Sequence, residues 1–111
     1  MDGQQKVTID QFKQLELRIG TIVEAEDHPQ ADRLYVLKVR MGERVKQLVA
    51  GIRASYDKES LIGKQVVVCD NLEPALLRGV ESQGMLLAAS DQDGIAVLSP
   101  DRIVAEGSRV K

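Results

Sequence analysis

The fold is decided by the stretch LRIGTIVEAE, residues 17–26, in which apolar or small side chains recur at every second position. This period of two is typical of a strand with one face buried and the other in water. The residues expected to share one face of this strand are Leu17, Ile19, Thr21, Val23 and Ala25. The next strand repeats the pattern, and its shared face holds Tyr35, Leu37, Val39 and Met41.

Further strands follow, separated by turn residues. They are expected at residues 34–41, 44–50, 65–70 and 85–90, with a short sixth at 95–98. A helical turn at residues 56–62, stopped by Gly63, separates the third strand from the fourth. Residues 71–84 are expected to form a loop, and no repeat or linker divides the chain. This is the element order of an oligonucleotide-binding (OB) barrel, so we predict an all-β, five-stranded OB barrel with short helices, one domain spanning residues 1–111.

A short helix is expected before the first strand. Thr8 can cap its N-terminus, Gln11 is the capping-box partner, and Asp10 lies near the positive end of the helix dipole. The apolar residues on one side of this helix are Ile9, Phe12 and Leu15. We expect that side to pack as a plug on a larger body.

The composition limits the class of protein. A length of 111 residues allows one domain, and a hydrophobic share of 43% is enough for one core. The single cysteine, Cys69, cannot form an internal disulfide, which fits a reducing compartment. The first residues, MDGQQKV, lack the apolar region of a secretory signal, and no apolar run is long enough to span a membrane. We therefore expect a cytoplasmic protein without a membrane partner.

The charges are segregated along the chain, although the net charge is only −2. Residues 16–32 carry five acids against one base, whereas residues 33–46 carry five bases against one acid. The five bases are Arg33, Lys38, Arg40, Arg44 and Lys46. A local basic face can therefore exist on a slightly acidic protein. The alternative is a solvated hairpin whose charged strand edges prevent aggregation.

No pattern in the sequence indicates catalysis. His28, the only histidine, precedes Pro29 in a loop with no obvious nucleophile partner, and Cys69 lies in an apolar run typical of a buried residue. One histidine and one cysteine cannot supply a closed zinc shell. Residues 79–84 lack the glycine spacing of a phosphate loop. We therefore expect no enzyme activity, no catalytic residue, no cofactor and no metal.

Two loops, residues 28–33 and 71–84, would flank the ligand face of an OB barrel and hold most of the unusual residue types. Asn71 and Ser82 could hydrogen-bond phosphate or base edges, and Arg78 could pair with phosphate. The alternative is that Asn71 and Ser82 only satisfy backbone groups of an irregular loop. With two tyrosines, one phenylalanine and no tryptophan, no stacking platform for single strands is evident, which favours a folded RNA.

Five stretches of the chain resemble the tRNA-binding domain family in order and spacing. They are LRIGTI (17–22), HPQADRLY (28–35), VAGI (49–52), NLEP (71–74) and GVESQGMLLA (79–88). The resemblance implies an OB fold that dimerises through a C-terminal extension, here about residues 95–111, and a homodimer that holds the outer corner of tRNA by shape. It also implies a role auxiliary to an aminoacyl-tRNA synthetase, with the methionyl enzyme as the expected partner. Apolar residues at 95–98 and 103–104, which one barrel need not bury, point to the same dimer.

Carried over by position, the resemblance assigns RNA contacts to the second hairpin and both loops. They are Arg33, Lys38, Arg40, Arg44, Lys46, Arg53, Arg78 and Ser82, with Asn71 as a further candidate. The chain departs from the family in one place, because Glu73 and the apolar residues 75–77 stand where strong tRNA binders are basic. Exposed leucines there would suit a protein-contact patch. The alternative function is therefore a chaperone-like or dimerisation module without significant RNA binding.

Overall fold

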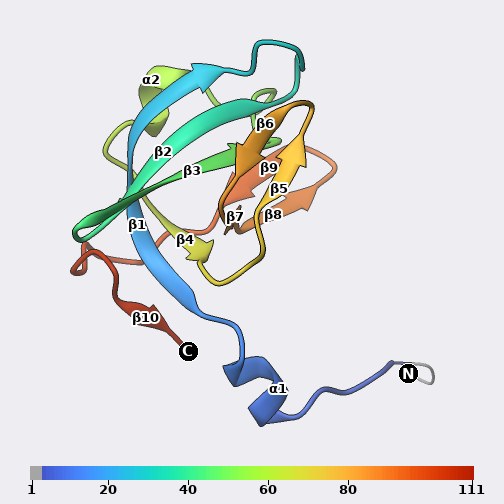
Figure 1. Cartoon of the computed structure of the whole chain (residues 1–111), viewed down its shortest axis with the longest axis vertical. Coiled ribbons are helices and arrows are strands. Elements are labelled where there is room, and N and C mark those ends of the chain that lie inside the picture. Colours follow the sequence, from blue (N-terminus) through green and yellow to red (C-terminus); the bar gives the residue numbers. More distant parts are fainter. Residues whose placement is uncertain (1–3) are drawn as a thin grey trace.

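The molecule is built on a curled antiparallel sheet that forms half of a barrel, shown in Figure 1 as a computed structural model that describes residues 4–111. The strands lie in the order β3-β2-β1-β4-β7, and β10 pairs with the start of β1. Their bounds are β1 Leu17–Asp27, β2 Tyr35–Met41, β3 Arg44–Ala50, β4 Gln65–Cys69, β7 Met85–Leu86 and β10 Arg109–Val110. Helix α2, Lys58–Leu61, connects β3 to β4 and ends before Gly63, whose φ is +87°. The predicted fold class and the helix after the third strand are confirmed.

The core lies inside the curl, and the alternation of β2 builds much of it. Tyr35, Leu37, Val39 and Met41 are buried together, as predicted. Strand β4 is buried along its whole length, because it lies between β1 and β7. The other buried members of the core are Ile22, Leu48, Ala50, Ile52, Leu61, Val66 and Val68.

The predicted inner face of β1 is only partly right in its first half, because Ile19 is buried as expected but Gly20 and Ile22 face the core cluster. A Cβ on Gly20 would lie 2.5 Å from Cγ1 of Val39, so the close approach of the two strands requires glycine. Ile22 is completely buried. The register with β2 shifts between Ile22 and Glu24, and a bulge at this point changes which residues face inward. Beyond it Ala25 packs on the core, as the alternation predicts.

Residues 71–84 contain a hairpin rather than the predicted loop. Its strands are β5, Ala75–Leu77, and β6, Val80–Ser82. The two residues of its turn are Arg78 and Gly79. We call this hairpin, residues 75–82, the arm. It lies alongside β3, and its tip lies at the same end of the molecule as the loop between β1 and β2 (Figure 1).

The predicted fifth strand is interrupted at Leu87. Its first part, β7, joins the main sheet, whereas its second part forms a separate hairpin with the predicted sixth strand. The bounds of this hairpin are β8 Ala88–Asp91 and β9 Gly94–Val97. The N–H of Leu87 donates to the carbonyl of Val67, and its own carbonyl accepts the N–H of Leu98. Leu87 therefore connects the main sheet to the segment that follows the second hairpin.

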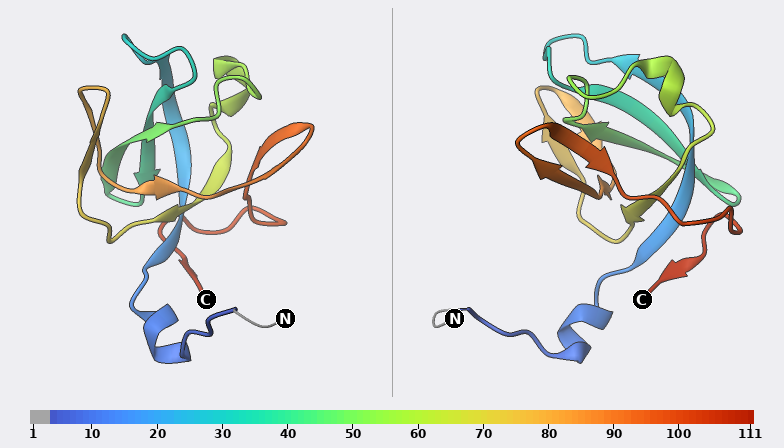
Figure 2. Two further views of the ribbon diagram at one scale, coloured as in Figure 1. Left: turned by 90° about the vertical axis from the view of Figure 1, so that its right-hand side faces the viewer. Right: turned by 180° about the vertical axis from the view of Figure 1, so that it is seen from behind.

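Helix α1, Ile9–Lys13, begins as predicted. The Thr8 hydroxyl accepts the N–H of Gln11 at 3.0 Å, and the Gln11 side chain accepts the N–H of Thr8 at 2.8 Å. The expected packing of the helix as a plug is wrong within a single chain, because no residue of α1 is buried and the helix lies apart from the barrel (Figure 2). Asn71 holds the segment after it, donating to the Gln14 carbonyl at 2.7 Å and accepting the N–H of Glu16 at 2.9 Å.

Candidate nucleic-acid interface

A buried carboxylate organises one part of the basic hairpin. Asp70 follows β4, is only 6% exposed, and has three cationic groups around it. Its carboxylate lies 2.6 Å from Arg44 Nη2, 2.6 Å from Lys46 Nζ and 3.7 Å from Arg18 Nε. Burial alone would raise the pKa of Asp70, but hydrogen bonds from Arg44 and Lys46 outweigh it and lower that pKa. This Asp70 cluster brings Arg44 and Lys46 together, and it also pairs both side chains with the Asp70 carboxylate.

Arg40 lies away from that cluster and binds the C-terminal tail. It forms a bidentate pair with Glu106, with Nε 3.0 Å from Oε1 and Nη2 2.9 Å from Oε2. The hydrogen bond from Arg40 lowers the pKa of Glu106 to about 2. Glu106 also accepts the N–H of Gly42 at 3.3 Å. Arg40 therefore fastens the tail to the β2–β3 hairpin, and its RNA contact stays a prediction.

Lys38 and Arg53 also have partners within the chain. Lys38 Nζ donates to Gln47 Oε1 on the neighbouring strand at 3.0 Å. Arg53 pairs with Asp27 at 3.2 Å, and its guanidinium carbon lies 5.9 Å from the centre of the Tyr35 ring. These contacts orient both side chains, and RNA contacts at the two positions stay predictions.

Two further predicted contacts meet at a hollow between the 28–33 loop and the arm. Arg33 is exposed, and no ion pair found within residues 4–111 involves its guanidinium. Arg78 is exposed at the tip of the arm and donates from Nη2 to the Gln30 carbonyl at 3.3 Å. The residues that line this loop–arm hollow are Gln30, Ala31, Asp32, Arg33, Leu34 and Arg78. The fold thus places arginines from two distant segments on one surface.

The tip of the arm has an unusual backbone. Arg78 has a φ of +52° and is the one non-glycine residue with a positive φ within residues 4–111; Gly79 follows at +89°. Two positive φ values in a two-residue turn are the mark of the type I′ hairpin, whose twist matches that of the strands. A left-handed conformation costs an arginine about 1–2 kcal/mol, so neighbouring contacts must hold it. The sequence analysis missed this turn, although Gly79 between the apolar residues Leu77 and Val80 was a signal for it.

His28 connects the arm to the 28–33 loop, a role that the sequence analysis missed. The residue is 4% exposed. Its Nδ1 accepts the N–H of Gln30 at 3.0 Å, and its Nε2 lies 2.9 Å from the carbonyl oxygen of Leu77. Leu77 is 49 residues away in the sequence, so no local pattern indicates this contact.

Asn71 and Ser82 satisfy backbone groups, which was the alternative to an RNA contact at both positions. The Ser82 hydroxyl accepts the N–H of Val49 at 3.0 Å and donates to the Gly84 carbonyl at 2.9 Å. Ser82 is buried, and Asn71 holds the segment after α1. Their RNA contacts stay predictions.

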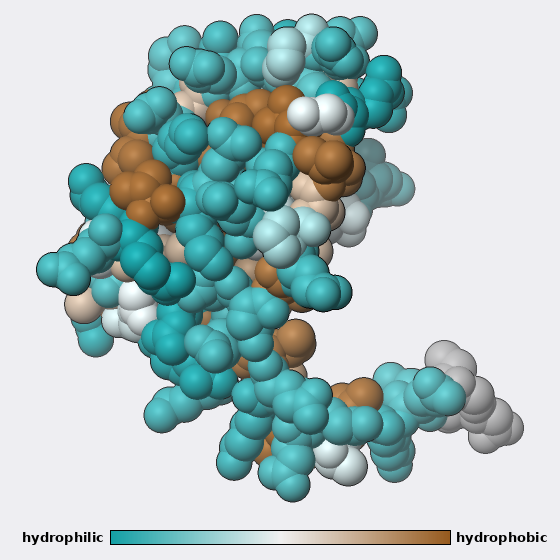
Figure 3. Space-filling view, in the orientation of Figure 1, coloured by the Kyte–Doolittle hydropathy of each residue, from teal (hydrophilic) through white to brown (hydrophobic). Residues whose placement is uncertain are grey.

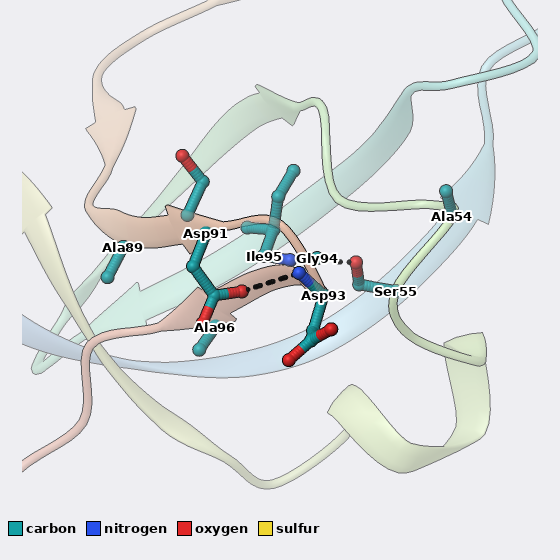
Figure 4. A pocket seen from close by; sticks show the side chains of 9 residues that line it. Ala54, Ser55, Ala89, Asp91, Asp93, Gly94, Ile95 and Ala96 are labelled. Carbon is teal, nitrogen blue, oxygen red and sulfur yellow. Dashed lines mark hydrogen bonds between the residues drawn. The ribbon is translucent and has the colours of Figure 1, made fainter.

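A second hollow lies between the segment after β3 and the β8–β9 hairpin (Figure 4). It is lined by Ala54, Ser55, Ala89, Ser90, Asp91, Asp93, Gly94, Ile95 and Ala96. This lining is small, apolar or acidic, so it does not suit a phosphate group. Within the described part of the chain, no three His, Cys, Asp or Glu side chains gather to hold a metal ion. In the same residues, no helix is long and apolar enough to cross a membrane.

The curled sheet and its flanking loops define an OB-fold module, and comparison with known proteins gives its family. A family model described as "Putative tRNA binding domain" matches residues 17–109. The chain therefore belongs to the tRNA-binding domain family, which confirms the resemblance seen in the sequence.

Several relatives are methionine–tRNA ligases. The chain is 55% identical over 105 residues to the enzyme of Thermococcus kodakarensis, a match that covers 95% of the chain and 14% of the ligase. It is 51% identical over 112 residues to the enzyme of Pyrococcus furiosus, covering 98% of the chain and 16% of the ligase. The chain thus spans about a seventh of the length of these relatives.

Solved structures share the fold over nearly the whole chain. A MetRS-related protein from Pyrococcus horikoshii has a TM-score of 0.90 at 31% identity, covering 97% of this chain and 100% of that one. The chaperone CsaA from Bacillus anthracis has a TM-score of 0.87 at 29% identity, covering 96% of this chain and 100% of that one. The same barrel therefore occurs in a synthetase-related protein and in a protein described as a chaperone.

Proposed function

We propose that the chain recognises folded tRNA by shape and phosphate charge and assists an aminoacyl-tRNA synthetase, with the methionyl enzyme as the first candidate. The observation that carries this proposal is the loop–arm hollow, whose lining includes the two exposed residues Arg33 and Arg78. Guanidinium groups bind phosphate oxygens through parallel N–H donors. Membership of the tRNA-binding domain family and the identity to methionine–tRNA ligases support this choice of ligand and partner.

The aromatic residues favour folded RNA over a single strand. Tyr35 is buried, and its hydroxyl donates to the Tyr56 carbonyl at 2.6 Å. The hydroxyl of Tyr56 accepts the N–H of Val97 at 3.0 Å, so both rings are engaged in the fold. Phe12 lies on α1, at the end of the molecule opposite the tip of the arm (Figure 1). Bases of a single strand stack on exposed rings near a basic groove, and the loop–arm hollow has none in its lining.

A homodimer is part of this proposal. In the expected dimer segment, residues 95–111, Leu98 and Ile103 are exposed, whereas Ile95 and Val97 pack on the core of their own chain, contrary to the expectation that one barrel leaves them uncovered. Ile9 and Phe12 also present an apolar side of α1 to solvent. Figure 3 shows apolar groups reaching the surface on the barrel and beside α1. A helix of five residues has little stability of its own in water, so it gains most from a surface that covers its apolar side. A second copy of the chain would supply that cover and would double the number of arginine hollows offered to one tRNA.

One observation favours a second candidate function, the binding of other polypeptides. Leu76 on the arm is 74% exposed, and Leu77 is 39% exposed. The similarity in fold to the chaperone CsaA fits this reading. Contact through exposed leucines would bury apolar surface, and its strength would change little with salt.

Binding to folded tRNA at several salt concentrations separates the two candidates, with single-stranded RNA of equal length as the control. For tRNA recognition we expect tighter binding to the folded RNA, and a log–log salt slope of about −0.7 to −0.9 for each phosphate contact. Equal binding to both RNAs, or no binding at low salt, would overturn the tRNA proposal. A solution mass of one chain at micromolar concentration would overturn the dimer.

A further inference from the structure

A buried imidazole lies where the two parts of the loop–arm hollow meet. His28 follows the end of β1 and is the only histidine of the chain. One ring nitrogen bonds the loop and the other bonds the arm: Nδ1 accepts the N–H of Gln30 at 3.0 Å, and Nε2 lies 2.9 Å from the Leu77 carbonyl oxygen. The ring therefore joins segments that no strand pairing connects.

These two bonds define the protonation state of the ring. A backbone N–H can only donate, so Nδ1 must offer a lone pair to Gln30. A carbonyl oxygen can only accept, so Nε2 must carry the proton that it shares with Leu77. Only the neutral imidazole with its proton on Nε2 makes both bonds. The bond from Nε2 to the Leu77 carbonyl is the one that joins the loop to the arm, because His28 and Gln30 both belong to the loop.

The same residues hold the arginine at the tip of the arm. Arg78 directly follows Leu77, and its Nη2 donates to the Gln30 carbonyl at 3.3 Å. Gln30 is thus bound through its N–H by His28 and through its carbonyl by Arg78. The backbone of Arg78 has a φ of +52°, an unfavourable conformation for arginine that contacts with neighbouring residues must stabilise.

We propose that His28 is a positioning residue that fixes the arm against the 28–33 loop and so holds Arg33 and Arg78 on one surface. The arrangement, and with it the affinity for tRNA, requires a side-chain donor at position 28 for the Leu77 carbonyl. This inference rests on the proposed function of the hollow.

Two substitutions separate the bonds of the ring. In His28→Gln the side-chain amide nitrogen can replace Nε2 as the donor to Leu77. In His28→Asn the amide oxygen can replace Nδ1 as the acceptor for Gln30, two residues further on. His28→Gln therefore keeps the bond to the arm, whereas His28→Asn keeps only the bond within the loop.

The test measures the affinity of the wild type and of both variants for folded tRNA at one pH and one ionic strength. We expect His28→Gln to keep the wild-type affinity and His28→Asn to lose about five- to tenfold, the equivalent of one hydrogen bond. Equal affinities in the two variants would overturn the inference. Loss of affinity in Arg78→Ala, measured beside it, shows that such a result does not come from failure of the proposed function.

A second measurement needs no RNA. Backbone amide signals of Leu77 and Arg78 are compared between the wild type and the two variants by NMR on the full chain. We expect these signals to stay close to their wild-type positions in His28→Gln and to move in His28→Asn. Unchanged signals of the arm in His28→Asn would overturn the coupling, whatever the RNA experiment gives.

Discussion

The Asp70 cluster and the loop–arm hollow each hold two of the predicted RNA contacts, but they use them differently. In the cluster, Arg44 and Lys46 approach a buried carboxylate to 2.6 Å. In the hollow, Arg78 donates to a backbone carbonyl and Arg33 is exposed at the surface. In the cluster, a phosphate must compete with Asp70 for Arg44 and Lys46. In the hollow, a phosphate can approach the exposed guanidinium groups of Arg33 and Arg78 without displacing a carboxylate. The number of basic residues on a hairpin therefore does not measure its capacity to bind RNA.

The largest expected effect comes from removing the hollow's charge in the double variant Arg33→Ala/Arg78→Ala. Each lost arginine–phosphate contact should weaken tRNA binding by about 1.5 kcal/mol, roughly tenfold. The salt slope should become shallower by about 0.7–0.9 for each contact. Binding isotherms at several salt concentrations measure both quantities. The charge-matched control is Arg102→Ala/Lys111→Ala in the tail, and an equal loss in that control would show that only net charge matters.

The Asp70 cluster is tested by Asp70→Asn, which removes the anion and leaves the cations in place. The free energy of unfolding should fall by about 1–3 kcal/mol, less than for a fully buried pair because Arg44 is half exposed. Affinity for tRNA should rise, since Arg44 and Lys46 become free to bind phosphate. Urea denaturation and tRNA binding on the same preparation measure the two changes. A lower affinity in the folded variant would contradict the contrast between the two regions.

Ser82→Ala tests whether a polar residue at the base of the arm acts through the fold. The buried N–H of Val49 would lose its acceptor, and the free energy of unfolding should fall by about 1–2 kcal/mol. The salt slope of tRNA binding should stay unchanged, because the hydroxyl is occupied by backbone groups. Thermal or urea unfolding gives the first value. A shallower salt slope in a stable variant would instead assign Ser82 to the RNA contact.

The smallest effect is expected from the pair of Arg40 and Glu106, which lies outside both regions. The pKa of Glu106 is lowered to about 2 in the folded chain, so this pair stabilises the fold above the ordinary carboxyl pKa. Its contribution should disappear as the pH falls from 4.5 to about 2. In Glu106→Gln the free energy of unfolding should fall slightly at neutral pH and depend less on pH in this window. Denaturation curves across the window test this, and a parallel pH dependence in variant and wild type would contradict it.

The sequence predicts those features of the fold that depend on residues close together along the chain. The buried face of β2 follows from strict alternation, and the start of α1 follows from Thr8 and Gln11 three residues apart. The inner face of β1 could not be predicted in the same way. The bulge after Ile22 has no characteristic residue pattern, because it depends on how β1 pairs with β2.

The candidate site shows the same limit. The basic residues are visible in the sequence, but their partners are not, because Asp70 lies 26 residues from Arg44 and Leu77 lies 49 residues from His28. Which cation is neutralised and which is free is decided by these distant contacts. The arm was missed because its strands are short and its turn uses arginine where asparagine or glycine is usual.

The central claim is that the loop–arm hollow, rather than the Asp70 cluster, meets the phosphates of tRNA. The most direct test follows the arginine side-chain Nε–H signals by NMR while folded tRNA is added to the full chain. The account predicts that the signals of Arg33 and Arg78 shift early in the titration, while those of Arg40 and Arg44 stay in place. Early shifts of Arg44 with no change at Arg33 and Arg78 would contradict it.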